Sequence, residues 1–382
     1  MIRKDFLPLA RPHIGDEEIS AVTHVLRSGF LTTGPKVFEF EHKLADYLKK
    51  DDPLYTVALN SCTACLFLAL KALGIKAGDE IIIPTWTFAA TAQVVEWIGA
   101  KPVFCDVESD SLNIDVEKAE SVITPRTKGI IPVHFAGYPC DMERIQGLAD
   151  RYDLKIVEDA AHAIGTRYNG IKIGNFSDVT CFSFYATKNL TMGEGGAAVS
   201  KNPKLIEKIR KLSYFGINKE AYQRYTKKGS WFYDVEELGY KCNLDSLHAA
   251  LGVEQLRKLE QMNKRRRDIA AKYRTGLDAR IGFTCDTPNH LHIYHLFPIL
   301  LPIEIARDTF MEHLKAYNIG SSVHFIPLHR HTLYRKCRSR QSFPVADSVF
   351  PRVVSIPMYP EMTDPDIGYV IENINAILKE MS

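Results

Sequence analysis

The chain has 382 residues, of which 46% are hydrophobic and 25% charged, a composition typical of a folded protein with a sizeable core. Its formal net charge of +2 and its interspersed acidic and basic residues give no reason to expect binding to nucleic acid or to a membrane surface. No apolar stretch reaches the ~18 residues that span a bilayer, and the acid-containing first residues do not resemble a signal peptide.

The eight cysteines indicate the compartment. Several of them, such as Cys105 and Cys181, lie in apolar strand-like runs, where a reduced and buried thiol is usual. Reduced thiols favour a cytoplasmic protein without a disulfide framework. The spacing of His, Cys and carboxylate residues predicts no metal site.

The first predicted element is a helix that ends before Gly29. It follows acidic residues, which favour a helix N-terminus, and one of its faces is apolar. That face carries Ile19, Val22, Val25 and Leu26.

Between about residue 55 and residue 200, short strand-like runs alternate with helical patterns such as the one from Thr63 to Leu73. The runs are apolar throughout, as expected of strands that helices cover on both faces. Repeated β-α units predict a mostly parallel, seven-stranded sheet with right-handed crossovers. The last strand follows Leu190 too closely for a crossover helix, which leaves an antiparallel direction open for it. The predicted strands are residues 56–59, 80–84, 101–107, 128–135, 154–159, 179–184 and 195–200.

The remaining elements predict a second, smaller α/β domain. A long helical pattern starts near Asp245, and the stretch after Thr363 carries isoleucines, Val370 and Leu378 on one stripe. We place the N-terminal arm and the large domain in residues 1–250 and the small C-terminal domain in residues 251–382.

Two residues at predicted strand ends suggest chemistry. Asp159 ends one strand, and ligands of parallel α/β sheets gather at the carboxyl ends of strands. An Asp at that position also commonly caps a helix or turn. The strand that delivers Ser183 is followed by Lys188, in a tight loop before Gly193, Gly195 and Gly196.

The pair of Asp159 and Lys188 suits pyridoxal phosphate (PLP). A carboxylate that keeps the pyridine ring protonated makes the ring an electron sink, and a lysine amine forms the imine that substrates displace. The ends of adjacent strands in one sheet place a carboxylate at the floor of such a site and an amine at its mouth.

A phosphate cradle is also present. The segment from Asn60 to Ala64 lies between a strand and a helix, and helix N-termini bind phosphate through free N–H groups. The alternative is that Ser61 or Thr63 only caps the helix. An aromatic ring that could stack on the pyridine is available at Trp86 or Phe88, although either could belong to the core.

Taken together, these segments resemble the DegT/StrS-type nucleotide-sugar aminotransferases, a branch of the aspartate-aminotransferase fold (PLP fold type I). The resemblance covers nearly the whole chain and is strongest to the branch that makes UDP-4-amino-4-deoxy-L-arabinose. The motifs that carry it occur in the family's order: GFLTTGPKV (29–37), NSCTACLFLAL (60–70), PTWTFAAT (84–91), VEDAAHAIG (157–165), SFYATKNLTMGEGG (183–196), LGYKCNLDSLHAALGVEQL (238–256), SSVHFIPLH (321–329) and SIPMYP (355–360).

The resemblance implies a role for each matching residue. Lys188 would form the Schiff base and carry the proton, and Asp159 would pair with the pyridinium nitrogen. His162 would lie near the cofactor ring, unless it is a structural histidine. The stacking ring would be Phe88, and the phosphate would be held by Cys62, Thr63 and Ser183.

The chain departs from the family in one loop. Lys241 stands where the family has an Asn that binds the PLP phosphate of the neighbouring subunit, and Asn243 replaces an Arg. An ammonium can bind phosphate as a point charge. Because the family builds its site between subunits, the resemblance implies a homodimer with shared active sites. Lys241 would be a phosphate ligand supplied in trans, and Asn243 is a further cofactor-binding candidate whose role stays open.

The expected reaction moves an amino group from glutamate to a nucleotide-linked keto-sugar, with the ketone expected at C4, by a ping-pong mechanism. The resemblance places Thr32, Thr33, His324 and His329 against the substrate. Three alternatives remain open: a PLP-dependent sugar dehydratase, for which His would replace Lys188; an amino-acid aminotransferase that uses Arg352 for a carboxylate; and a non-catalytic regulatory protein on the same fold.

Overall fold

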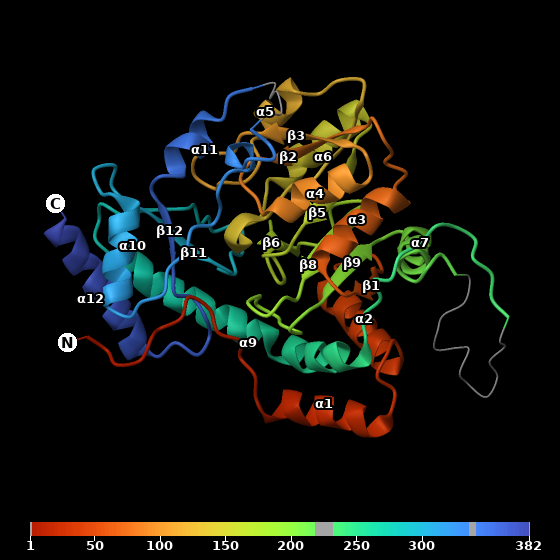
Figure 1. The fold of residues 1–382 in the computed structure, drawn as a ribbon, viewed down its shortest axis with the longest axis horizontal. Helices are drawn as coiled ribbons and strands as arrows, with labels where there is room; N and C mark the ends of the chain where they lie inside the picture. The colour runs from red at the N-terminus through yellow and green to blue at the C-terminus, as the bar shows by residue number, and fades with distance from the viewer. Residues whose placement is uncertain (1, 218–231, 336–340, 382) are drawn as a thin grey trace.

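The computed structural model describes residues 2–217, 232–335 and 341–381. At its centre lies a seven-stranded sheet in the order β1-β9-β8-β5-β4-β2-β3 (Figure 1). The five strands β8, β5, β4, β2 and β3 pair in parallel with one another. The strand β9 is antiparallel to both of its neighbours, β1 and β8. The mostly parallel sheet predicted from the sequence is therefore confirmed. Its strands are β1 (Tyr55–Leu59), β2 (Glu80–Pro84), β3 (Lys101–Cys105), β4 (Thr127–Ile130), β5 (Lys155–Asp159), β8 (Val179–Ser183) and β9 (Gly196–Ser200).

One predicted strand is shorter than expected. The run 128–135 pairs regularly only as β4, which ends at Ile130. Pro132 has no N–H to donate to a neighbouring strand, and beyond it Val133 forms only an isolated parallel bridge with Asp159. The segment 131–135 thus runs beside the end of β5 without extending the ladder.

Helices cover both faces of the large sheet, so each face has its own hydrophobic core. Along β5, Val157 packs into one core and Ile156 into the other, as the alternation of a strand requires. The first core includes residues of α3 (Cys62–Ala72), α4 (Ala89–Trp97) and α7 (Pro203–Ser213). The second includes residues of α2 (Pro35–Leu48), α5 (Val116–Ser121) and α6 (Met142–Tyr152).

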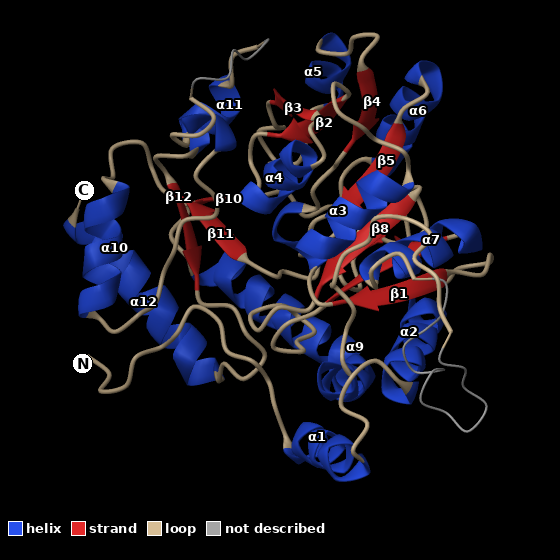
Figure 2. Cartoon of the chain, turned by 45° about the vertical axis from the view of Figure 1, so that its right-hand side comes forward, coloured by secondary structure: helices blue, strands red, loops and turns tan. Residues whose placement is uncertain are grey.

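A smaller sheet lies beside the large one (Figure 2). Its antiparallel strands are β10 (Gly282–Phe283), β11 (Phe297–Leu300) and β12 (Val353–Ile356), and they share a third core with α10 (Arg307–Ala316) and α12 (Asp364–Glu380). The long helix α9 (Ser246–Gly276) contributes its first half to the second core and its later half to the third. The division at residue 250 remains a prediction.

The first helix, α1 (Asp16–Ser28), packs against α9 through Glu18, whose carboxylate lies 2.6 Å from Lys258 Nζ. Of its predicted apolar face, Val25 is buried, whereas Ile19 is 59% and Leu26 55% exposed. One chain alone therefore leaves part of this apolar face uncovered.

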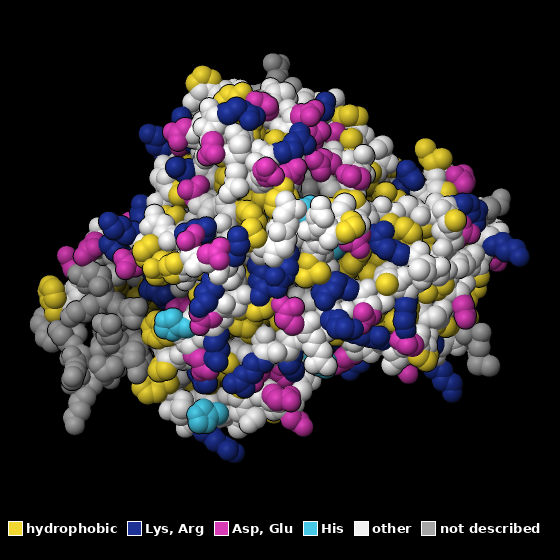
Figure 3. All heavy atoms as spheres, turned by 180° about the vertical axis from the view of Figure 1, so that it is seen from behind, with side chains coloured by type: hydrophobic (Ala, Val, Ile, Leu, Met, Phe, Trp, Pro, Cys, Tyr) yellow, Lys and Arg dark blue, Asp and Glu magenta, His cyan; other side chains and the backbone are white. Residues whose placement is uncertain are grey.

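The shorter elements connect these layers: the two-stranded sheet of β6 (Arg167–Tyr168) and β7 (Ile171–Lys172), α11 (Pro344–Val349), and the 3-10 turns η1 (Phe135–Gly137) and η2 (Leu328–Arg330). None of the helices in the described part of the chain is both long and apolar enough to cross a membrane. On the face shown in Figure 3, basic and acidic side chains lie interspersed. Within the described ranges, no group of three or more His, Cys, Asp and Glu side chains is arranged to hold a metal ion.

Candidate active site

A cavity of about 520 Å³ opens at the carboxyl ends of the central strands. Its floor and one wall come from the large sheet and the N-terminus of α3, and the other wall comes from the small domain and the N-terminal arm. Of the predicted site residues, it contains Lys188, Asp159, His162, Cys62, Thr63, Phe88, Ser183 and His324. Residues far apart in the sequence thus meet where parallel strands end, as sheet topology predicts.

Lys188 lies in the loop that follows β8 and is half-buried in the cavity wall. Its backbone N–H donates to Tyr185 O at 2.9 Å, which closes a tight turn. Its Nζ has no hydrogen-bond or ion-pair partner among the residues that the structure describes. Burial lowers the pKa of Lys188 to about 8, although the charge of Asp159 opposes the shift. With this pKa about a tenth of the amine is neutral and nucleophilic at pH 7, far more than for a lysine of ordinary pKa.

Asp159 ends β5 and lies buried at the floor of the cavity. Thr91 Oγ1 donates to its Oδ2 at 2.8 Å, and the Ala161 N–H donates to its Oδ1 at 3.2 Å. Burial raises the pKa of Asp159 above its ordinary value, against these hydrogen bonds and the charge of Lys188. A cation bound over the floor would favour the ionised carboxylate.

The N-terminus of α3 forms the predicted cradle. Ser61 is the N-cap, and its Oγ accepts the Ala64 N–H at 3.1 Å, so the capping alternative holds for this hydroxyl. The first helical residues, Cys62 and Thr63, line the cavity beside Ser183. The strand β9 comes so close that a Cβ on Gly196 would lie 2.4 Å from Cys62 N. Helix amides and a hydroxyl at one end of a cavity are suited to a phosphate.

The two aromatic candidates separate clearly. Trp86 is fully buried in the first core and meets Phe135 edge to face. Phe88 is 64% exposed and lines the cavity, with its ring 6.1 Å from that of Phe325. Phe88 therefore presents an open ring face, and Trp86 does not.

His162 is buried, and its Nδ1 has no hydrogen-bond partner among the described residues. Burial lowers its pKa well below the usual 6.5, helped by the charge of Lys188. The ring is thus neutral, with an unsatisfied polar atom in the cavity wall. A bound group that offers a hydrogen bond would satisfy it.

The small domain adds cavity residues to which the sequence assigned no role, although Phe325 and Met358 stand in the motifs 321–329 and 355–360. His295 lies with its ring 4.3 Å from that of His162, and its Nδ1 donates to Asn189 Oδ1 at 3.1 Å. Phe325 and Met358 also line the cavity, as does Leu9 of the N-terminal arm. Their positions depend on the packing of two domains, so local sequence carries no signal for them.

Within a single chain, five predicted contacts lie outside the cavity lining. His329 is held on both ring nitrogens, by Thr85 Oγ1 at 2.7 Å and by Asp347 at 3.0 Å. The other four form a separate cluster. In it, Lys241 donates to Asn243, Asn243 donates to Thr33 Oγ1 at 2.6 Å, and the Thr32 carbonyl accepts from Ser246.

The expectation that the cysteines include no C-x-x-C pair is wrong, because Cys62 and Cys65 have this spacing. Both thiols are free and buried, as is that of Cys181, whose carbonyl oxygen lies 3.5 Å from Cys62 Sγ. Burial raises the pKa of Cys62 and of Cys65 well above the usual value. The thiols are thus protonated and unreactive, which is the character of core cysteines.

The alternative role of Arg352 finds no support. Its Nε donates to Leu301 O at 2.7 Å, and it does not line the cavity. An amino-acid aminotransferase would need a guanidinium that reaches the substrate carboxylate.

The donor set of the cavity fits PLP. A lysine amine of lowered pKa, a buried carboxylate, a helix N-terminus and an open aromatic ring surround one space, and His162 Nδ1 there lacks a partner among the described residues. These groups match the aldehyde, the pyridine nitrogen, the phosphate and the ring face of the cofactor.

Comparison with known proteins agrees with this fit. The model of the DegT/DnrJ/EryC1/StrS aminotransferase family matches residues 12–375. The spore coat polysaccharide biosynthesis protein SpsC of Bacillus subtilis is 46% identical, over 99% of this chain and 98% of that protein.

Solved structures agree as well. Spr1654 of Streptococcus pneumoniae, a proposed sugar aminotransferase solved in PLP and PMP forms, superposes in its PMP form with a TM-score of 0.92 at 33% identity, over 98% of this chain and all of that one. PseC of Helicobacter pylori, an aminotransferase of pseudoaminic acid biosynthesis, gives a TM-score of 0.92 at 26% identity, over 99% of this chain and all of that one. The chain belongs to the DegT/DnrJ/EryC1/StrS aminotransferase family and is a PLP-dependent sugar aminotransferase.

Proposed function

We propose that the enzyme moves an amino group from glutamate to a nucleotide-linked sugar with a ketone at C4, and that donor and acceptor use the site in turn. The observation that carries this proposal is the meeting of Lys188, Asp159 and the α3 N-terminus in one cavity. Amino donor and keto-sugar both form imines, so a single site can serve both halves of a ping-pong cycle.

Lys188 is the nucleophile and the proton carrier in this proposal. When bound, PLP supplies an electron sink for the carbon that gains or loses a proton. The released Lys188 amine then takes the proton from the donor carbon and later returns one to the sugar carbon. Its pKa of about 8 suits both tasks, because neutral and protonated amine are then both populated near neutral pH.

Asp159 and His162 prepare the site for these transfers. The Asp159 carboxylate, held by Thr91 and the Ala161 amide, would keep the ring nitrogen protonated. His162 is neutral, so we assign it a hydrogen bond to the cofactor rather than a charge. Cys62, Thr63 and Ser183 would hold the phosphate, and Phe88 would stack on the open ring face.

The substrate side of the cavity is assigned to the small domain. His324 lines the cavity, and burial lowers its pKa to about 4, so it would contact the sugar as a neutral group. The contacts of His329 with Thr85 and Asp347 favour a supporting role over direct contact. We therefore propose that His329 lies behind the cavity wall and supports it, in place of the direct sugar contact expected from the sequence.

A spectroscopic cycle tests the reaction. Purified protein with PLP is mixed with glutamate, and UDP- or dTDP-linked 4-keto-sugars are then added while the visible absorbance is recorded. We expect glutamate to remove the visible band and a keto-sugar to restore it. Restoration by 2-oxoglutarate alone, with every keto-sugar inert, would refute the acceptor assignment. No bound chromophore after addition of PLP would favour the regulatory alternative, and loss of water from the sugar without amine transfer would favour the dehydratase.

We further propose a homodimer in which Lys241 and Asn243, with Thr32 and Thr33, complete the partner's site. The exposed apolar side chains of α1, Ile19 and Leu26, support such an interface. Mixing Lys188→Ala and Lys241→Ala proteins tests it, since a hybrid dimer would contain one intact site. Random exchange would then restore about a quarter of the wild-type activity. A mixture that stays inactive would place Lys241 in its own chain's site.

The cellular compartment of the enzyme and the destination of its product are also proposals. The free thiols of the described cysteines suit the reducing cytoplasm, where we place the enzyme. The spore coat polysaccharide relative supports an amino sugar destined for a polysaccharide, and we include lipopolysaccharide among the destinations proposed. Sugar analysis of a strain that lacks the gene would check the destination.

A further inference from the structure

Glu158 is a fully buried carboxylate next to Asp159, yet it does not line the cavity. Alternation along β5 turns its side chain to the face opposite Asp159, into the second hydrophobic core with Ile156. A buried carboxylate there is costly unless strong hydrogen bonds compensate it. Among the described residues it has no Lys or Arg partner. Its presence therefore calls for a role.

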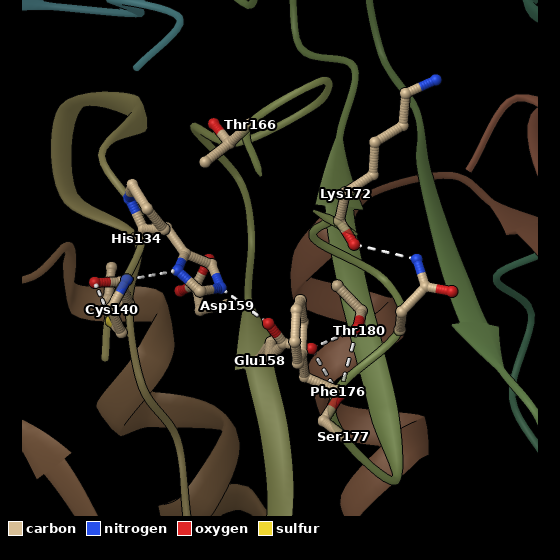
Figure 4. A network of polar contacts seen from close by, with 12 residues as sticks. His134, Cys140, Glu158, Asp159, Thr166, Lys172, Phe176, Ser177 and Thr180 are labelled. Carbon is tan, nitrogen blue, oxygen red and sulfur yellow. Dashed lines mark hydrogen bonds and ion pairs between the residues drawn. The ribbon is translucent and has the colours of Figure 1, made fainter. Parts of the chain in front are cut away.

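Three side chains from two neighbouring segments donate to Glu158 (Figure 4). Ser177 and Thr180 donate to Oε1 at 2.7 and 2.6 Å, and Thr180 lies opposite Glu158 in the β5–β8 ladder. His134 Nε2 lies 2.8 Å from Oε2. The carboxylate thus ties β5 to β8 on one side and to the segment after β4 on the other.

The hydrogen bonds define the protonation state of His134. The Cys140 backbone N–H donates to His134 Nδ1 at 3.0 Å, so that nitrogen carries a lone pair. The proton of a neutral ring must then be on Nε2, which donates to Glu158. His134 is therefore a neutral donor in this arrangement, and all three hydrogen bonds point toward the Glu158 carboxylate, as they do when a carboxylate is ionised and can only accept.

The same segment also holds the Asp159 backbone. The Asp159 N–H donates to Pro132 O at 2.9 Å, and the His134 N–H donates to Asp159 O at 3.3 Å. Val133 bridges Asp159 between these bonds. Residues 132–134 therefore clamp the Asp159 peptide with their backbone and Glu158 with the His134 ring.

We propose that Glu158 and His134 form a positioning pair, which fixes the Asp159 carboxylate against the PLP ring. The buried negative charge of Glu158 also helps Asp159 to keep the ring nitrogen protonated. The pair acts through Asp159 and touches neither cofactor nor substrate. Among the other titratable groups nearby, Cys140 and Cys181 remain uncharged because burial raises the pKa of both thiols. Asp178 lies near the start of β5, where its carboxylate accepts the Ile156 N–H.

Glu158→Gln separates this role from plain structural support. A glutamine can turn its oxygen to His134 and its amide to the hydroxyls of Ser177 and Thr180, which can accept, so the variant removes mainly the charge. Glu80→Gln is the matched control. Glu80 is equally buried at the opposite end of the same sheet, where it accepts from Thr124 at 2.7 Å and pairs with Arg126.

Two readouts on purified protein avoid reliance on activity. We expect Glu158→Gln to weaken PLP binding to the apoprotein about fivefold, measured by fluorescence quenching. We also expect the pH midpoint of the bound cofactor's visible absorbance to fall by on the order of 0.5 unit, since loss of a nearby negative charge disfavours the cationic form. Glu80→Gln should change neither. Equal changes in PLP affinity and pH midpoint in the two variants would show that Glu158 has only a structural role.

A double-mutant cycle tests whether Glu158 acts through Asp159. Glu158→Gln should lower kcat about tenfold in the wild-type background, with KM within twofold, and have little effect in Asp159→Asn. A full tenfold loss in both backgrounds would overturn the proposal. If Glu158→Gln does not fold, Ser177→Ala removes one donor from a half-buried position. It should shift PLP affinity and the pH midpoint in the same direction, about twofold and on the order of 0.2 unit, and unchanged values would overturn the pairing.

Discussion

The hydroxyl of Thr91 is the direct support of the Asp159 carboxylate. It is fully buried, donates to Asp159 Oδ2 at 2.8 Å and is itself 2.8 Å from the Thr87 hydroxyl. Thr91→Val keeps the shape of the side chain and removes the donor. A hydrogen bond to a charged group contributes about 1.5–3 kcal/mol. If the whole of it is lost in the transition state, kcat falls about 10- to 150-fold.

The assay is the single-turnover conversion of the PLP form by glutamate, followed by absorbance. Thr124→Val is the control, since Thr124 Oγ1 also donates to a buried carboxylate, that of Glu80, at 2.7 Å. Both variants should lose comparable thermal stability, because each leaves a carboxylate short of one donor. Only Thr91→Val should slow the conversion. A Thr91→Val enzyme that converts at the wild-type rate, with PLP fully bound, would refute the role given to Asp159.

Three further predictions follow from the cavity. Because burial lowers the pKa of Lys188 to about 8, the rate at which the apoprotein captures PLP should fall about tenfold per pH unit below pH 8 and level off above it. Stopped-flow absorbance measures this rate. A rate that still rises steeply toward pH 10 would contradict the lowered pKa. Burial holds the pKa of His162 well below 6.5, so the ring stays neutral between pH 6 and 8. His162→Gln should therefore lower kcat on the order of tenfold without changing the shape of the pH–rate profile in that range. Loss of an inflection near pH 6.5 in the variant would show that His162 titrates in the wild-type enzyme. Gly196→Ala would place a Cβ 2.4 Å from Cys62 N and should lower PLP affinity, measured by calorimetry, more than about tenfold. Gly368→Ala is the control, because no atom of the described residues lies within 4 Å of the added Cβ, and its PLP affinity should stay unchanged. Equal affinities of the two variants would contradict the close packing of β9 on α3.

The large sheet was predictable because its strands carry a local signal. Short runs that are apolar on both faces are typical of strands between two helical layers, and β5 illustrates this with Val157 and Ile156 in separate cores. The antiparallel direction left open for β9 follows from the short loop after Leu190. The early end of β4 was not predicted, although Pro132, which has no N–H to donate to a neighbouring strand, indicated it.

The floor of the site was predictable for the same reason. Asp159 and Ser183 end strands and Lys188 follows one, and the direction of parallel strands brings such ends together. His295 and Leu9 enter the cavity through the packing of the small domain and the N-terminal arm, which no local pattern encodes. His329 shows the converse: its motif suggested a substrate contact, but its two ring nitrogens are already held by Thr85 and Asp347.

The central claim is that Lys188 Nζ is the point at which PLP is attached. The most direct measurement is to reduce the PLP-loaded protein with borohydride, digest it and locate the phosphopyridoxyl group by mass spectrometry. We expect a single modified peptide, labelled at Lys188, and no label when glutamate is added before reduction. A label on any other lysine, or a label that glutamate does not abolish, would contradict the account.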